Sequence, residues 1–165
     1  MSNDHLEITQ LAENIIDKAQ QKTLTIALAE SCTGGMIAAA LTGISGSSAV
    51  FDRGFVTYSN QAKIDMLRVS NVTLEQYGAV SEQTARAMVD GTLIAAPMAD
   101  LALSVTGIAG PGGGGQDKPV GLVHFVCQRR DTPQTHAMDI FSGDRHMVRQ
   151  KAVRKALMMI GDALA

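Results

Sequence analysis

The sequence predicts an α/β protein, a single three-layer α/β/α domain with a mainly parallel sheet and an antiparallel hairpin near the C-terminus. Apolar runs of strand length alternate with segments of helical periodicity, which is typical of a parallel sheet covered on both faces. Late in the chain, two strand-like runs at 120–128 and 135–141 flank a short polar turn at 129–133, as in a hairpin. No linker or internal repeat divides the 165 residues, so we treat 1–165 as one domain.

The first half of the chain contains four predicted helices and two predicted strands. Ile8, Leu11, Ile15 and Ile16 recur at helical spacing in a polar segment and indicate the first helix. An apolar run that ends in Glu30 reads as a buried strand. In order, we expect a helix at 5–21, a strand at 24–30, helix 34–42, strand 50–58, helix 60–67 and a short helix near 73–77.

The second half begins with Ser81, which is typical of a helix N-cap, and Glu82 follows in the first turn of a helix that ends near Pro97. A short buried strand at 101–105, a glycine-rich loop at 107–119, the hairpin and a closing helix at 144–164 complete the prediction. On the closing helix we expect the following residues to face the core: Val148, Ala152, Leu157, Met158 and Ile160.

Composition narrows the class of protein. The net charge is −2 and basic residues do not cluster, so we expect no direct nucleic acid binding. The two cysteines lie far apart in the sequence and the four histidines show no metal-binding spacing, so we expect reduced thiols and no metal. The start of the chain lacks the features of a secretory signal, and no apolar run is long enough to span a membrane. We therefore expect a soluble cytoplasmic protein without a membrane partner.

The segment Ala29–Gly35 places two hydroxyls, a thiol and two glycines on a turn between a strand and a helix. Unpaired N–H groups at a helix start favour negative charge, so such a turn suits a phosphate or the oxyanion beside a nucleophile. Ser31 is the candidate nucleophile, and Thr33, Gly34 and Gly35 are candidate binding residues. The competing interpretation is that Ser31 or Thr33 only caps the helix. Cys32 is a weaker nucleophile candidate, because a small thiol packed beside a strand is usually inert.

A second polar loop, Thr57–Lys63, ends a strand and starts a helix. A lysine near a helix N-terminus experiences positive potential, which lowers its pKa, and burial lowers it further. A partly neutral Lys63 could serve as the base for a serine nucleophile, although a solvated surface lysine is the ordinary alternative. Tyr58 is a candidate to orient that lysine or to contact substrate.

A third loop, Thr106–Pro111, precedes four consecutive glycines and resembles a backbone nest for an anion. Its candidate binding residues are Thr106, Gly107, Ala109 and Gly110, and a mobile surface loop is the alternative. Arg145 and Arg149 lie one helical turn apart and either grip a phosphate or form surface ion pairs.

These three loops all follow predicted parallel strands. Ligands of open α/β sheets bind outside the carboxyl ends of the strands, so we expect the loops to converge there into one site.

Taken together, these residues resemble the CinA C-terminal domain family, whose members include nicotinamide mononucleotide deamidases. The similarity runs in order over about residues 10–160, covers nearly the whole chain, and rests on several long motifs. They are Leu28–Gly35, Gly54–Asn60 with Lys63, Gly78–Ser81, Val105–Pro111, Lys118–Gly121 and Gly143–Arg145.

The resemblance implies hydrolysis of nicotinamide mononucleotide to nicotinate mononucleotide and ammonia in pyridine nucleotide recycling, with no cofactor. By position, Ser31 resembles the nucleophile and Lys63 the base, with Tyr58 assisting. Thr33, Gly34, Gly35, Thr106, Gly107, Ala109, Gly110 and Arg145 would bind the substrate. The oligomeric state is not readable from the sequence; related proteins often self-associate, and a homodimer is the state we expect.

Two other functions stay open at this stage. A non-catalytic module that binds or senses nucleotides would use the same glycine loops but would not need a lysine of lowered pKa. A thiol-dependent hydrolase would use Cys32 as its nucleophile and would be inactivated by Cys32→Ser.

Overall fold

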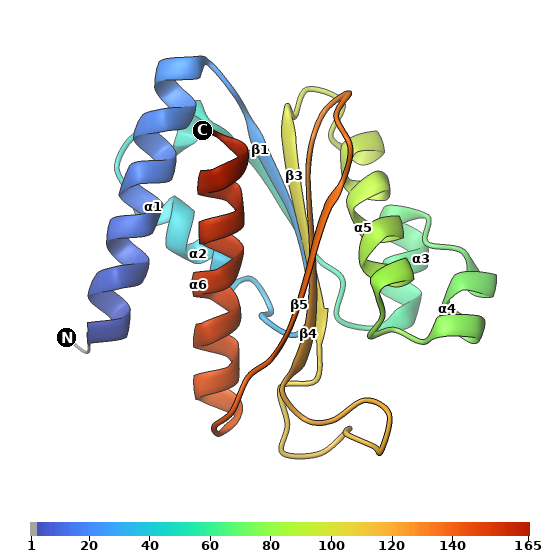
Figure 1. Ribbon diagram of the computed structural model, residues 1–165. Coiled ribbons are helices and arrows are strands. Elements are labelled where there is room, and N and C mark those ends of the chain that lie inside the picture. The colour runs from blue at the N-terminus through green and yellow to red at the C-terminus, as the bar shows by residue number, and fades with distance from the viewer. Residues whose placement is uncertain (1–2) are drawn as a thin grey trace.

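The computed structural model describes residues 3–165 and shows a five-stranded sheet with helices on both faces (Figure 1). The strands are β1 (Ile26–Glu30), β2 (Phe51–Val56), β3 (Leu101–Gly107), β4 (Leu122–Arg129) and β5 (Thr135–Ile140). The helices are α1 (Asn3–Lys22), α2 (Met36–Thr42), α3 (Asn60–Leu67), α4 (Asn71–Tyr77), α5 (Glu82–Ala95) and α6 (Arg145–Ala163), with a 3-10 turn at Ser47–Ala49. Every predicted element is present in the predicted order.

The sheet has the strand order β2-β1-β3-β4-β5. β1 pairs in parallel with both β2 and β3, and β4 pairs antiparallel with both β3 and β5. Only β4 therefore runs against the other strands, which confirms the predicted sheet and hairpin. It also confirms that the carboxyl ends of β1, β2 and β3 lie at one edge, the lower edge of the sheet in Figure 1.

Helices α1, α2 and α6 cover one face of the sheet, and α3, α4 and α5 cover the other (Figure 1). On the first face the core includes Ile15, Ile26, Leu41, Phe125 and Leu157, all of them buried. On the second face a smaller cluster joins Ala29 of β1 to Leu67, Val69, Leu74 and Met88. The predicted three-layer architecture is thus confirmed.

Helix α3 is packed very closely on α5. A Cβ atom added at Gly91 of α5 would lie 1.9 Å from the carbonyl oxygen of Leu67, so only glycine permits this approach. The close packing matters for the site, because α3 carries Lys63 and its position relative to the sheet is fixed through α5.

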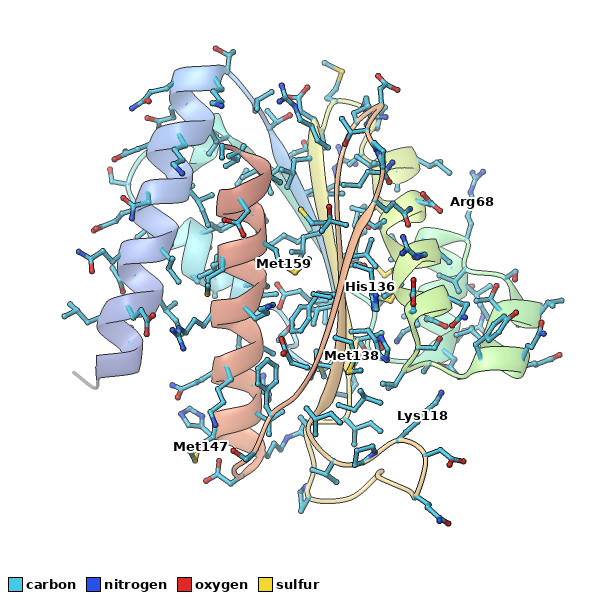
Figure 2. All side chains as sticks on the ribbon, viewed as in Figure 1. Arg68, Lys118, His136, Met138, Met147 and Met159 are labelled. Carbon is cyan, nitrogen blue, oxygen red and sulfur yellow. The ribbon has the colours of Figure 1, made fainter. Side chains whose placement is uncertain are left out.

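One predicted core residue is wrong. Met158 is 43% exposed, and its neighbour Met159 is buried instead. Val148, Ala152, Ala156 and Met159 follow one another at spacings of four, four and three residues, and this stripe places Met158 on the outer face of α6. Figure 2 shows Met159 between α6 and the sheet, whereas Met147 lies at the outer side of the lower end of the helix.

The boundary of α2 also differs from the prediction. The helix begins at Met36 rather than at residue 34, because Gly34 and Gly35 both have positive φ angles of 59° and 96°. Residues in that left-handed region cannot belong to a right-handed helix, so the two glycines lengthen the turn after Ser31. Within residues 3–165, no helix combines the length and apolarity needed to cross a membrane.

Candidate active site

Ser31 and Lys63 meet at the carboxyl end of β1. The Nζ atom of Lys63 lies 3.1 Å from Ser31 Oγ and donates a hydrogen bond of 2.7 Å to the carbonyl oxygen of Thr57. The backbone of Ser31 is attached to the sheet, because its N–H group donates a hydrogen bond to the carbonyl oxygen of Val105 in β3. Two of the three polar loops predicted to converge are therefore joined by a direct side-chain contact.

Lys63 is buried to an unusual degree for a lysine, with 1% of its surface exposed. Burial disfavours the charged ammonium and lowers the pKa of Lys63 from 10.5 to about 8. A lysine with this pKa is neutral in roughly one molecule in ten at pH 7 and in about half of the molecules at pH 8. Its free electron pair can then accept the proton of a serine hydroxyl at the observed distance. The interpretation of Lys63 as a solvated surface residue is wrong.

The N-terminus of α2 is capped by Glu30 rather than by Ser31 or Thr33. The buried carboxylate of Glu30 accepts hydrogen bonds from the N–H groups of Gly35 and Ile37 through Oε2, at 3.0 and 3.1 Å. Its Oε1 accepts from Ala38 N–H at 2.8 Å. The acid thus takes the role that an N-cap hydroxyl usually has, and leaves the Ser31 hydroxyl free for its contact with Lys63.

The opposite side of the same turn is held by Arg149 from α6. Its Nε donates to the carbonyl of Cys32 at 3.1 Å and its Nη2 to that of Thr33 at 2.9 Å. A carbonyl and the next N–H point in opposite directions from one peptide plane, so Thr33 N–H is directed away from the guanidinium. Among residues 3–165, the N–H groups of Cys32 and Thr33 donate to no other residue, whereas those of Gly34 and Gly35 donate to Ser31 and Glu30.

Tyr58, Arg145 and Gly110 link the second and third loops. Arg145 donates from Nη1 to the Gly110 carbonyl at 2.9 Å and from Nη2 to the Tyr58 hydroxyl at 2.7 Å. Tyr58 is 58% exposed, and a Cβ atom built on Gly34 would be 4.0 Å from its ring. Tyr58 therefore lies beside Gly34 of the Ser31 turn, and its hydroxyl is bonded to Arg145 rather than to Lys63.

The remaining residues predicted for the third loop are more deeply integrated in the sheet. The Thr106 hydroxyl donates to the Ala79 carbonyl at 2.7 Å, and Gly107 pairs with Val123 of β4. Ala109 is buried, and Gly110 has a φ angle of 81°. Thr106 follows Val105, whose carbonyl accepts a hydrogen bond from Ser31 N–H, so the loop begins beside the Ser31 turn.

Two buried hydroxyls beside Lys63 and Ser31 lack a hydrogen-bond partner among the described residues, those of Thr33 and Thr57. A buried hydroxyl without a partner costs roughly 1–3 kcal/mol, so two such groups in neighbouring loops are unusual in a native protein. Cys32 lies between Ser31 and Thr33, and burial raises the pKa of its thiol to about 11. At neutral pH this sulfur is a thiol, which is a poor nucleophile.

The sequence did not indicate functional roles for Glu30 and Thr57, and it suggested for Arg149 either a phosphate contact beside Arg145 or a surface ion pair, not the contacts with the carbonyls of Cys32 and Thr33. Glu30 did have a signal in the sequence, because a carboxylate at the end of a fully buried strand needs hydrogen-bond donors or a positive charge nearby.

Within residues 3–165, no three His, Cys, Asp or Glu side chains are grouped as ligands of one metal ion.

The chain is similar to curated relatives, some of comparable length and some much longer. The chain is 59% identical over 127 residues to a nicotinamide-nucleotide amidohydrolase PncC of Enterobacter agglomerans, with 77% of each chain covered. It is 47% identical over 154 residues to the protein of the same name from Escherichia coli K12, with 93% of each chain covered. A CinA-like protein of Fusobacterium nucleatum is 47% identical over 137 residues, and the chain spans 33% of that longer relative.

Solved structures share the fold. A crystal structure of a competence/damage inducible protein from Agrobacterium tumefaciens superposes with a TM-score of 0.91 at 51% identity, over 96% of this chain and 95% of the other. A CinA superfamily protein from Escherichia coli superposes with a TM-score of 0.88 at 35% identity, over 96% and 90%. The family model for the CinA C-terminal domain matches residues 8–164, and the chain belongs to this family.

Proposed function

We propose that this protein is a nicotinamide-nucleotide amidohydrolase that converts nicotinamide mononucleotide and water to nicotinate mononucleotide and ammonia. The observation that carries the proposal is the 3.1 Å contact between Ser31 Oγ and a buried Lys63 whose pKa is lowered to about 8. The names of relatives at 47–59% identity supply the substrate. The reaction needs no cofactor, and its place is pyridine nucleotide recycling in the cytoplasm.

In the first step, neutral Lys63 accepts the Ser31 proton while Oγ attacks the carboxamide carbon of the nicotinamide ring. The carbonyl oxygen becomes an oxyanion. We assign its donors to the N–H groups of Cys32 and Thr33, which donate to no other residue among those described. The residue after the nucleophile supplies such a donor in other strand-to-helix nucleophile turns.

In the second step, the Lys63 ammonium returns its proton to the amide nitrogen, the carbon–nitrogen bond breaks, and ammonia leaves. Water then attacks the acyl-enzyme with Lys63 again as base, and releases the carboxylate and free Ser31. The fixed positive charge of the pyridinium ring disfavours a charged lysine nearby and makes the carbonyl carbon more electrophilic. Tyr58 assists by holding Arg145 beside the turn, and Thr33, Gly34, Gly35, Thr106, Gly107, Ala109 and Gly110 complete the substrate site.

The direct test is ammonia release from nicotinamide mononucleotide by the wild type and by Ser31→Ala. We expect the variant to lose at least about 10⁴-fold in kcat, because the covalent route is removed. Cys32→Ala is the matched control in the neighbouring position, and we expect it to stay within about threefold of wild type because its thiol is protonated.

The outcomes separate the alternatives. Undiminished turnover by Ser31→Ala would contradict the nucleophile assignment, and inactivation by Cys32→Ala would favour a thiol hydrolase. A wild type that binds the nucleotide without releasing ammonia would instead be a binding or sensing module. Sedimentation equilibrium of the same preparations tests the expected homodimer.

A further inference from the structure

The Ser31 turn is held by charges of opposite sign on its two sides. Glu30 binds the N–H groups of Gly35, Ile37 and Ala38, and Arg149 binds the carbonyls of Cys32 and Thr33. Every N–H group of the first turn of α2 therefore has an acceptor within the protein: Met36 donates to Thr33, and Ile37 and Ala38 donate to Glu30. The helix N-terminus is already occupied by a carboxylate and is not free for an anionic substrate group.

Glu30 is unusual in its position as well as its contacts. It is the last residue of β1, it is 1% exposed, and it directly precedes Ser31 in the chain. Its carbonyl also accepts a hydrogen bond from Thr57 N–H, so its backbone is fixed to the second loop while its side chain is fixed to α2. A single residue thus ties together the nucleophile, the helix that follows it, and the segment whose carbonyl orients Lys63.

The charge of Glu30 is compensated by the helix rather than by Lys63. A carboxylate at a helix N-terminus is stabilised by the dipole and by charge-assisted hydrogen bonds. No ion pair joins Glu30 and Lys63 among the described residues, and burial is the main cause of the lowered pKa of Lys63. Glu30 can therefore hold the geometry of the turn without holding a proton on the base.

Resting on the proposed function, we infer that Glu30 is a positioning residue for catalysis: by capping α2 from the preceding residue, it fixes Ser31 Oγ against Lys63 and keeps the N–H groups of Cys32 and Thr33 turned toward the reacting carbonyl. An ordinary N-cap would stabilise the helix alone. Here the cap and the nucleophile are adjacent in the chain, so a shift of one moves the other.

The test uses Glu30→Gln, which keeps the shape of the side chain but places an amide donor against backbone N–H groups. The first readout is the rate constant for labelling by a small alkyl fluorophosphonate, in which a Ser31 Oγ–phosphorus bond forms and fluoride leaves. We expect a loss of about 10²-fold, because displacements near 1 Å cost this much in positioned reactions. The second readout is turnover of nicotinamide mononucleotide, in which kcat falls by a similar factor while KM stays within about twofold.

The matched control is Ser70→Ala, which removes the side-chain cap of α4, whose hydroxyl accepts from Thr73 N–H at 3.0 Å. A cap that is only structural lowers thermal stability and leaves the labelling rate of folded protein unchanged, and we expect this of Ser70→Ala. If Glu30→Gln does not fold, Glu30→Asp carries the test, because it keeps the charge but withdraws the oxygens by one methylene. The same loss is expected there.

The pH dependence of labelling separates positioning from a direct electrostatic effect. If Glu30 acts by positioning, the labelling rate constant of Glu30→Gln should level off at high pH at a lower value than that of the wild type. Its midpoint should stay near pH 8, since the charge of Glu30 is compensated by α2. A labelling rate constant that levels off at the wild-type value, with or without a shifted midpoint, would overturn the inference. A wild type that is labelled at Ser31 but releases no ammonia refutes the proposed function alone, whereas absence of labelling at Ser31 refutes both.

Discussion

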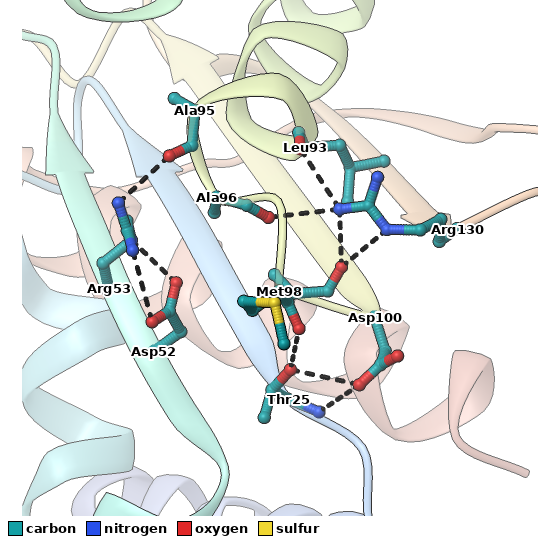
Figure 3. Close-up of polar contacts among 10 residues, drawn as sticks. Thr25, Asp52, Arg53, Leu93, Ala95, Ala96, Met98, Asp100 and Arg130 are labelled. Carbon is teal, nitrogen blue, oxygen red and sulfur yellow. Dashed lines mark hydrogen bonds and ion pairs between the residues drawn. The ribbon is translucent and has the colours of Figure 1, made fainter.

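Two edges of the sheet each contain a charged side chain that caps a helix, and they differ in what is left unsatisfied. At the amino edge, Arg130 caps the C-terminal end of α5 (Figure 3): its guanidinium donates to the carbonyls of Leu93, Ala96 and Ala99 at 2.8–3.1 Å. At the carboxyl edge, Glu30 caps the N-terminal end of α2. Both charges have the sign that the helix dipole favours.

Among the described residues, no fully buried side-chain nitrogen or oxygen of the amino edge lacks a hydrogen-bond partner. The single hydroxyl proton of Thr25 is shared between the Met98 carbonyl at 2.6 Å and Asp100 Oδ2 at 3.1 Å, and Asp100 also accepts from Thr25 N–H at 2.8 Å (Figure 3). The carboxyl edge differs, because it holds two unpaired buried hydroxyls and a buried lysine without an acidic partner among the described residues. Groups that the fold leaves unsatisfied are the ones that a substrate can use.

Of the substitutions that compare the two edges, the one at the buried lysine has the largest expected effect. Lys63→Met keeps the length and apolar volume of the side chain but removes the proposed base, and we expect kcat to fall by about 10²–10⁴-fold. Thermal stability should stay equal or rise, because a charge no longer has to be buried. Lys18→Met, at an exposed position of α1, is the matched control and should keep full activity.

The same lysine sets the pH dependence of the wild type. Only neutral Lys63 accepts a proton, so kcat/KM should rise with pH through about 8 and then level off. Since the folded pKa lies below the unfolded value of 10.5, the unfolded chain binds more protons between these values, and the stability of the wild type relative to Lys63→Met should increase from pH 8 to 10.5. Activity that is constant from pH 6 to 10 would contradict the role of Lys63 as base.

An intermediate effect tests the amino edge. Arg130→Ala should lower the free energy of unfolding by about 1–3 kcal/mol, because carbonyls at the end of α5 lose a charged donor. Urea denaturation measures this loss, and kcat and KM of the folded variant should not change. Arg53→Ala is the milder comparison, since its exposed side chain makes one bond to the Ala95 carbonyl at the same helix end (Figure 3). A large loss of kcat in Arg130→Ala would erase the distinction between the two edges.

Much of the fold and the meeting of Ser31 with Lys63 could be predicted, because both depend on local patterns and on one topological rule. The apolar periodicity of each helix or strand can be recognised from the sequence of that segment alone, and parallel strands bring their carboxyl ends to one edge of the sheet. The predictions that were wrong depended on local backbone geometry. Gly34 and Gly35 have positive φ angles, so α2 begins two residues later than predicted, and Met159 rather than Met158 is buried on α6.

The roles of Glu30 and Arg149 could not be predicted in the same way. Acids and arginines are exposed in most proteins, and a sequence does not show which backbone groups will come within their reach. The Ser31 hydroxyl had looked like a cap because Ser often caps helices. The Ser31 hydroxyl does not cap α2, because the longer side chain of Glu30 accepts hydrogen bonds from N–H groups at the start of the helix. The path of the chain through Gly34 and Gly35 brings these N–H groups to Glu30.

The smallest expected effect concerns Tyr58, which lies at the rim of the carboxyl edge. Its hydroxyl accepts from Arg145 at 2.7 Å and is not bonded to Lys63, so Tyr58→Phe should loosen Arg145 rather than remove a proton carrier. The expected result is a rise of about three- to tenfold in KM with kcat nearly unchanged, equivalent to one partly exposed hydrogen bond.

Tyr77→Phe is the control, because Tyr77 is the other tyrosine of the chain and lies at the end of α4. It should leave both kinetic constants unchanged. If Tyr58→Phe instead lowered kcat by 100-fold and displaced the pH midpoint, the hydroxyl would take part in proton transfer beside Lys63. Tyr58 would then belong with Lys63 among the groups that transfer protons. It would no longer belong with Arg145, to which it is bonded, among the groups that bind the substrate.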